Sequence, residues 1–98
     1  MEKGTPHCKL QVVRRLIVEG RVRMTKTALF GGAALSFDAL AIVEVVKTLA
    51  LADFYKSMTT HDDHTVWQDV YRPTTAAGEV YLKLTVVEDV LVVSFKEL

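Results

Sequence analysis

The stretch Asp53 to Pro73 reads Asp-Phe-Tyr-Lys-Ser-Met-Thr-Thr-His-Asp-Asp-His-Thr-Val-Trp-Gln-Asp-Val-Tyr-Arg-Pro. Before it, apolar residues recur at helical spacing, whereas from Phe54 onward they recur at period two, which is the period of a β-strand. The stretch also contains two of the three histidines and the only tryptophan. It marks the change from a helical half to a sheet half, and we expect it to carry the first half of any chemical site.

Two strands follow this stretch, at about 80–86 and 90–96, and each alternates apolar with polar residues. The expected core side chains are Val80, Leu82, Leu84 and Val86 on the first strand and Leu91, Val93 and Phe95 on the second. A two-residue turn at Glu88-Asp89 would pair Tyr81 with Lys96. A slip by one residue would bury Lys96, so this register is strongly favoured.

The two strands predicted inside the opening stretch, about 54–60 and 65–72, leave the choice of face open. In the second, Val66 and Val70 favour one core face, whereas Trp67 and Tyr71 favour the other. A three-residue loop at 61–63 would place Lys56 opposite Gln68, and a four-residue loop would send it to the other face. The favourable choice gathers six polar side chains on one surface: Lys56, Gln68, Arg72, Tyr81, Lys83 and Lys96.

The N-terminal half predicts three helices and no chemical motif. They are a helix at about 6–19 that begins at Thr5-Pro6 and ends at Gly20, a short helix at 26–30 capped by Thr25 and ended by Gly31-Gly32, and a helix from Ser36 or Asp38 to about Leu49. The third carries an apolar stripe of Leu40, Val43, Val46 and Leu49, which needs a surface to cover. The predicted fold class is therefore α+β, with three N-terminal helices packed on one face of a mainly antiparallel C-terminal sheet.

A chain of 98 residues is expected to form one domain over residues 1–98, burying roughly 60–65% of its unfolded surface. The formal net charge is zero, but residues 1–26 carry seven basic and two acidic groups, a net +5, and the remainder carries a net −5. This asymmetry fits either a basic surface for an acidic partner or phosphate backbone, or a solvated helix face.

Cys8 is the only cysteine, so the chain can form no internal disulfide and no cysteine-based zinc site by itself. The opening residues lack the apolar core of a signal peptide, and Asp38, Glu44 and Lys47 interrupt the most apolar region. We therefore expect a soluble cytoplasmic protein without a membrane segment.

The run His61-Asp62-Asp63-His64 suggests a divalent metal, but consecutive ligands in a turn need unusual backbone geometry. A polar hairpin loop accounts for it better, so no metal and no cofactor are predicted. Trp67 is expected in the core in preference to a base-stacking platform. The lysines of the polar face are either solubility devices or the means for metal-free RNA cleavage, which needs a base for the 2′-hydroxyl proton, an acid for the leaving 5′-oxygen and cations for the phosphate.

Four segments closely resemble the MqsR toxin family: Phe54–Thr60, Asp63–Pro73, Val80–Lys83 and Val90–Lys96. The opening Met-Glu-Lys-x-Thr-Pro-His and the chain length agree with it, and Ala28 to Ala52 is the least similar part. The resemblance implies a RelE-like fold and a ribosome-independent mRNA interferase that cleaves mRNA at GC-containing sites. It also implies a zinc-containing, DNA-binding antitoxin, MqsA, through which the protein would reach operator DNA only indirectly.

The family's proposed catalytic positions match Lys56, Gln68, Tyr81 and Lys96 in this chain. Arg72 and Lys83, on the same predicted face, are expected to bind the RNA. The alternative is a non-catalytic nucleic-acid or protein-binding module that acts as a co-repressor with its antitoxin. The two differ in geometry, because an enzyme needs these side chains on one face and within reach of one phosphate.

Overall fold

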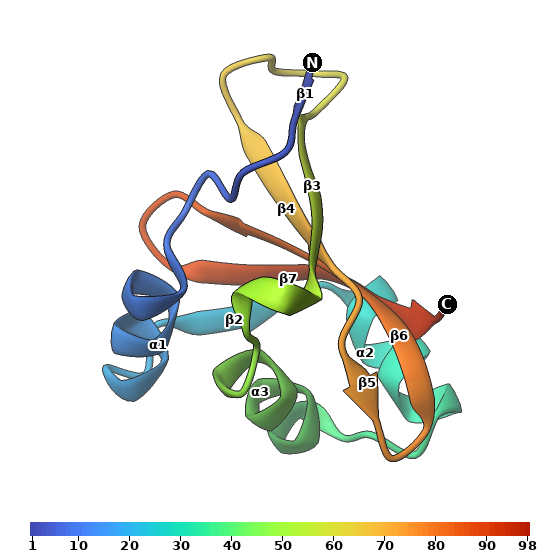
Figure 1. Cartoon of the computed structure of the whole chain (residues 1–98). Coiled ribbons are helices and arrows are strands. Elements are labelled where there is room, and N and C mark those ends of the chain that lie inside the picture. Colours follow the sequence, from blue (N-terminus) through green and yellow to red (C-terminus); the bar gives the residue numbers. More distant parts are fainter.

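The computed structural model describes all residues 1–98 and contains three α-helices and seven strands (Figure 1). In chain order the elements are β1 (Glu2–Lys3), α1 (Leu10–Val18), β2 (Val22–Met24), α2 (Lys26–Ala34), α3 (Ala39–Lys47), the 3₁₀ turn η1 (Leu51–Asp53), β3 (Phe54–Thr59), β4 (Trp67–Tyr71), β5 (Thr74–Thr75), β6 (Gly78–Val86) and β7 (Val90–Glu97). The predicted α+β class is confirmed, as is the change from helix to strand after Asp53.

The sheet has the strand order β1-β3-β4-β6-β7-β2, and β5 pairs with β6 beside this path. All pairs are antiparallel except β2 with β7, which is parallel, so the sheet is mixed. The two edge strands, β1 and β2, come from the half predicted to be helical only. Strands of two and three residues are too short to show a period of two, which is why the sequence pattern missed them.

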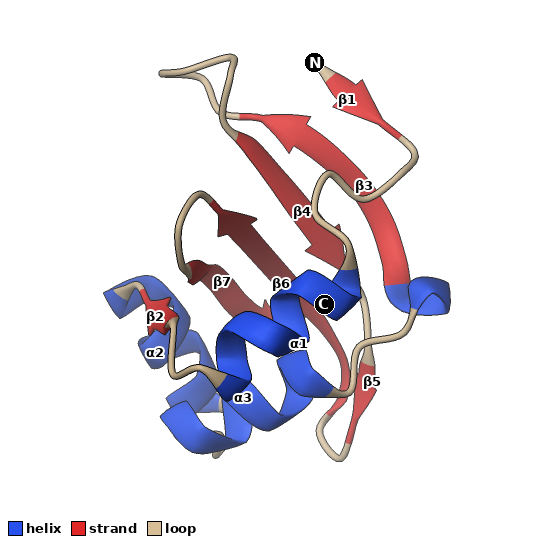
Figure 2. Ribbon diagram, turned by 90° about the vertical axis from the view of Figure 1, so that its left-hand side faces the viewer, coloured by secondary structure: helices blue, strands red, loops and turns tan.

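One core cluster joins the helices to the sheet, with buried side chains from α1, α2 and α3 packed against residues of β4, β6 and β7. Figures 1 and 2 show that the far ends of β3 and β4, with β1 beside them, extend beyond the helices. No single helix is both long and apolar enough to cross a membrane; α2 and α3, which meet at a 93° bend, satisfy the requirement of length and composition only together.

Helix α1 begins at Leu10, and the prediction that it starts at Thr5-Pro6 is wrong. The reason is a long-range contact: the carboxylate of Asp69, which is only 2% exposed, accepts the backbone N–H groups of His7 and Cys8, each at 3.0 Å. It also accepts the Ser57 hydroxyl at 2.6 Å. Because the N–H groups of His7 and Cys8 donate to a side chain of the sheet, the residues before Leu10 run as an extended segment from β1.

Helix α2 runs through the glycine pair to Ala34 instead of ending there, while its predicted cap is confirmed by the Thr25 hydroxyl, which accepts the N–H of Ala28 at 3.1 Å. The glycines serve close packing. A Cβ at Gly31 would overlap the backbone carbonyl of Phe95, so α2 lies directly against β7. Helix propensity alone would make the glycine pair the end of the helix, but here the pair is the surface through which α2 contacts its neighbours.

Helix α3 is capped by Asp38, whose carboxylate accepts the N–H of Ala41 at 2.8 Å. Asp38 was one of the two residues predicted to cap this helix. The predicted stripe is correct at Val46 and Leu49, which are buried, and wrong at Leu40, which is 76% exposed. Ile42 is buried instead, because a strict three-residue spacing drifts around a helix of 3.6 residues per turn, so Leu40 turns away from the face that Val46 buries.

The last hairpin confirms the predicted pair of Tyr81 with Lys96, and it pairs Lys83 with Ser94. Beyond them the register shifts, because Leu84 pairs with Val92 and Val93 is left as a bulge. The loop therefore has three residues, and Val90 and Val92 enter the core in place of the predicted Leu91 and Val93.

Gly31→Ala should lower the free energy of unfolding by about 1–3 kcal/mol, because the new methyl group must displace β7 or α2. Urea unfolding of the two proteins measures this difference. Gly4→Ala is the matched control, since nothing lies within 4 Å of a Cβ there. If Gly31→Ala were instead more stable, as the helix propensity of alanine alone would predict, α2 would not rest on β7 as described.

The Tyr71 hydroxyl is buried without a hydrogen-bond partner, and burial, with the nearby Asp69 carboxylate, raises the pKa of Tyr71. The folded protein thus holds this side chain protonated where the unfolded chain ionises, so its contribution to stability is present below the ordinary pKa of about 10 and is lost as pH rises above it. Tyr71→Phe should match or exceed wild-type stability near neutral pH, by up to about 1 kcal/mol, and should lose less stability in the alkaline range. Urea unfolding across that range tests this, with Tyr55→Phe, at an exposed tyrosine, expected to keep the wild-type decline.

Candidate active site

One face of the sheet carries polar side chains, and the register decides which residues belong to it, because directly paired residues of neighbouring strands point to the same side. A central row runs across four strands as Lys56, Val70, Lys83 and Ser94. Tyr81 and Lys96 form the next row on one side, and Met58 with Gln68 the next row on the other. We call this surface the polar face.

Val70 shows that the polar face lies opposite the core. It is fully buried, yet it is the one buried apolar side chain outside the core cluster. Lys56 and Lys83 flank it directly on the neighbouring strands. Lysine stems cover apolar surface while their ammonium groups stay in water, so Val70 anchors the two lysines beside each other over the sheet.

The structure resolves the choice of face that the sequence left open. Tyr71 points to the core and Gln68 to the polar face, with Lys56 on the same side. Lys56 pairs with Val70 and not with Gln68, because the connection between β3 and β4 is longer than three or four residues. All of Lys56, Gln68, Tyr81, Lys83 and Lys96 therefore share one face.

These side chains form a strip and not a single cluster. Gln68 precedes Asp69, which pairs with Leu84, so Gln68 lies about four residues along the strands from Tyr81, or about 13 Å. Lys83 lies between them. Tyr81 and Lys96 are close, with the Lys96 ammonium 5.2 Å from the centre of the Tyr81 ring. One phosphate can reach Tyr81, Lys83 and Lys96 together more readily than it can reach Gln68.

The three lysines of the polar face have different surroundings. The Lys56 ammonium is 3.3 Å from the carboxylate of Glu2 on β1. The Lys96 ammonium lies beside the Tyr81 ring. Lys83 is half-buried, and burial first and the charge of Lys96 second lower the pKa of Lys83. The face thus combines two lysines whose ammonium groups have partners with one, Lys83, whose pKa is lowered.

Arg72 directly follows β4 and is exposed, and its guanidinium centre lies 4.0 Å from the centre of the Tyr55 ring. A planar cation on an aromatic face is held in place yet keeps its donors for a ligand. Tyr55 and Glu2 were missed by the sequence reasoning. Tyr55 lies at the register shift and Glu2 on a two-residue strand, so no pattern in the sequence signals either one.

The His61–His64 run lies in the connection between β3 and β4, where Asp63 acts as a turn residue. Its carboxylate accepts the backbone N–H of Thr65 at 2.8 Å and the Thr65 hydroxyl at 2.6 Å. The hydroxyl is the larger cause that lowers the pKa of Asp63. No group of three or more histidine, cysteine, aspartate or glutamate side chains in the chain is placed to hold a metal ion.

Trp67 lies at the far end of β4 and is only partly buried, so the prediction of a core tryptophan is wrong. Its ring stacks on His7 with a centroid distance of 5.5 Å, and the Lys3 ammonium lies 4.1 Å from its centre. The helices do not reach this end of the sheet (Figure 2), and His7 and Lys3 of the N-terminal segment contact the ring in their place.

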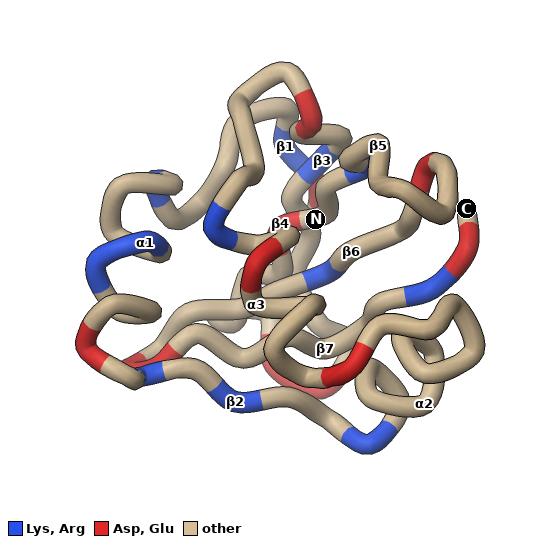
Figure 3. The backbone as a smooth tube through the Cα atoms, turned by 90° about the horizontal axis from the view of Figure 1, so that it is seen from below, with Lys and Arg blue, Asp and Glu red and all other residues tan.

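Several basic groups of residues 1–26 contact the protein itself. Arg14 donates to the backbone carbonyls of Lys47 and Leu49, and Arg21 lies 3.0 Å from Asp89. Figure 3 shows lysines and arginines spread over several elements and mixed with acidic residues. Of the two alternatives for this segment, the arrangement favours structural and solvated charges over one basic patch.

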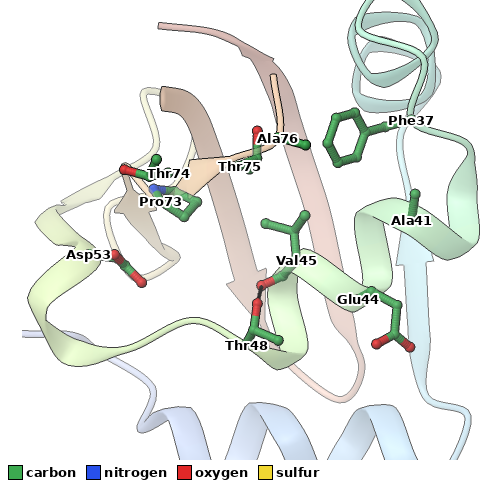
Figure 4. A pocket seen from close by; sticks show the side chains of 10 residues that line it. All are labelled: Phe37, Ala41, Glu44, Val45, Thr48, Asp53, Pro73, Thr74, Thr75 and Ala76. Carbon is green, nitrogen blue, oxygen red and sulfur yellow. Dashed lines mark hydrogen bonds between the residues drawn. The ribbon is translucent and has the colours of Figure 1, made fainter. Parts of the chain in front are cut away.

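The largest pocket, of about 480 Å³, lies between α3 and the segment Pro73–Ala76, with Phe37, Val45 and Asp53 among its lining residues (Figure 4). It includes none of the six predicted polar-face residues, and neither do the three other pockets. The polar face is thus an open surface, which suits an extended polymer better than a small enclosed ligand.

Comparison with known proteins identifies the family of the chain. The family described as motility quorum-sensing regulator, toxin of MqsA, matches residues 5–97. The mRNA interferase toxin MqsR of Escherichia coli (strain K12) is 54% identical over 97 residues, which cover 99% of each chain. The match includes every strand that contributes to the polar face and extends through the helical half, so the chain belongs to the MqsR toxin family.

Proposed function

We propose that this chain, acting as one domain over residues 1–98, is the toxin of a type II toxin–antitoxin pair and an endoribonuclease of the mRNA interferase class. The observation that carries the proposal is that Lys56, Gln68, Tyr81 and Lys96 share one open face with Lys83 between them. The extensive similarity to an mRNA interferase toxin supports it. The α+β arrangement, with its core on one side of the sheet, supports a RelE-like fold.

RNA lies along the polar face with its scissile phosphate over the row of Tyr81 and Lys96. Lys56, Lys96 and Arg72 neutralise phosphate charge, which grows on the oxygens as the 2′-oxygen attacks. Glu2 holds Lys56 in place without covering it, since that lysine side chain is 31% exposed. A cationic face of this kind stabilises the transition state without a metal ion.

Gln68 acts on a different part of the RNA. At about 13 Å from Tyr81 along the strands it is too far to share the scissile phosphate, so it contacts the neighbouring nucleotide. Its amide both donates and accepts hydrogen bonds, which suits the edge of an unpaired base. We infer that Gln68 contributes to a preference for GC-containing sites in mRNA, independently of the ribosome.

The partner is a zinc-containing, DNA-binding antitoxin of the MqsA type, and the pair acts in the cytoplasm, where its substrate is. The family description, which names a toxin of MqsA, supports this assignment. The toxin reaches operator DNA only through that antitoxin, since its lysine-lined polar face is reserved for RNA.

Lys56→Ala and Lys96→Ala should each lower the rate of RNA cleavage by about 100-fold or more, because each removes a cation from the transition state. Gel analysis of purified RNA with no ribosomes present measures the rate, and wild-type products should carry 2′,3′-cyclic phosphate and 5′-hydroxyl ends. Lys47→Ala, on the exposed surface of α3, is the control and should cleave like wild type.

Full cleavage by a folded Lys56→Ala, Lys96→Ala double variant would contradict the proposed site. RNA that wild-type protein binds but leaves intact would instead identify a non-catalytic binding module that acts with its antitoxin.

Cleavage should also be unchanged by a chelator such as EDTA, and by His61→Ala and His64→Ala, because no step in this mechanism uses a metal. The same cleavage assay measures it, after dialysis against chelator. Loss of activity that added zinc or magnesium restores would overturn the metal-independent mechanism while leaving the assignment to an endoribonuclease intact.

A further inference from the structure

We propose that Lys83 is the general base of the reaction, the group that takes the proton from the 2′-hydroxyl. This inference rests on the proposed endoribonuclease function and assigns a role that is distinct from holding phosphate. It makes Lys83 a catalytic residue, although its position first suggests only one more cation for RNA.

The first argument is its place on the polar face. Lys83 lies in the central row, paired with Val70 on one side and Ser94 on the other. Tyr81 is two residues away on the same strand, or about 7 Å, and points to the same side. A nucleotide whose phosphate lies over Tyr81 and Lys96 therefore places its ribose toward Lys83.

The second argument comes from what surrounds each lysine. Lys56 forms an ion pair with Glu2, and Lys96 lies against the Tyr81 ring, so each of these ammonium groups has a partner. Lys83 forms no ion pair. Its half-buried side chain is paired across the strands with Val70, which is fully buried.

The charged groups that face Lys83 are mostly cationic. They are Lys96 on β7, Lys56 on β3 and Arg72 after β4, together with the phenol of Tyr81 on its own strand. The carboxylates on this side of the sheet are Glu79 on β6, four residues or about 13 Å along the strand, and Glu2 on β1, which pairs with Lys56; Asp69 on β4 lies on the opposite face. Burial and the Lys96 charge lower the pKa of Lys83, which brings this lysine toward the neutral amine that a base requires.

The step balances with the groups present. The lone pair of the neutral Lys83 Nζ takes the 2′-hydroxyl proton, and the 2′-oxygen forms a bond to phosphorus. The bond from phosphorus to the 5′-oxygen breaks, and that oxygen takes the proton of the Tyr81 hydroxyl. The products are a 2′,3′-cyclic phosphate and a 5′-hydroxyl; Lys83 then releases its proton to solvent, and Tyr81 regains one.

The test compares Lys83→Arg and Lys83→Met with wild type in single-turnover cleavage of a short RNA, with Lys47→Met as the matched control on α3. An arginine keeps the positive charge but does not give up a proton. We expect Lys83→Arg to bind the RNA like wild type and to cleave it about 100-fold more slowly or worse. Thermal unfolding of each variant confirms that it folds, and if Lys83→Met does not, Lys83→Arg alone decides.

A second substrate separates base from acid. With sulfur in place of the 5′-oxygen at the scissile bond, the leaving group needs no proton. Tyr81→Phe should then regain its rate, whereas Lys83→Arg should stay slow. Lys83→Arg cleaving within about 3-fold of wild type, or regaining its rate on the sulfur substrate, would overturn the proposal. Failure of wild-type protein to cleave any RNA would instead overturn the proposed function.

Discussion

The buried carboxylate of Asp69 is the interaction on which the rest of the structure depends. It lies in the middle of the sheet, on β4, and accepts two backbone amides from the N-terminal segment and one hydroxyl from β3. A buried carboxylate is stable only with such donors, and each donor would be unpaired without it. The contact fixes where α1 begins and delivers β1 to the edge of the sheet. Through β1 it also brings Glu2 to Lys56, so it reaches from the core side of the sheet to the polar face.

The polar face depends on two irregularities in the ladder as much as on its regular pairs. The shift between Phe54 and Lys56 pairs Phe54 with the core residue Tyr71, while Lys56 stays in the polar-face row beside Val70. The shift at Val93 sends Val90 and Val92 into the core while Tyr81 and Lys83 keep their partners at the other end of the hairpin. A bulge adds one residue to a strand and so changes the alternation of its side chains. One strand can then place core residues correctly on one side of the bulge and polar-face residues correctly on the other. Both irregularities border the row that contains Lys83.

The parts of the fold that could be predicted are those in which a wrong arrangement carries a large penalty. The pairing of Tyr81 with Lys96 was predictable because a slip would bury Lys96, and the Thr25 and Asp38 caps were predictable because few residue types satisfy orphan amides. The bulge at Val93 was not, since Val92 and Val93 are equally apolar. Neither was the start of α1, because the partner of its N-terminal amides lies some 60 residues away in the sequence. The polar-face residues were identified largely through the family resemblance. Their arrangement as a strip could be seen only from the strand register of the structure.

The parallel pairing of β2 with β7 has a consequence for how the molecule assembles. Val22 meets Val90, so two strands far apart in the sequence must find each other, and a loop of that length is slow to close. Helix α2 also packs against β7 through Gly31, and β7 carries Lys96. A growing chain without β7 therefore lacks both the surface that α2 packs against and one lysine of the polar face. The fold therefore offers no partly built intermediate with a working polar face. If the face cleaves RNA, a half-made chain is harmless to the message that encodes it.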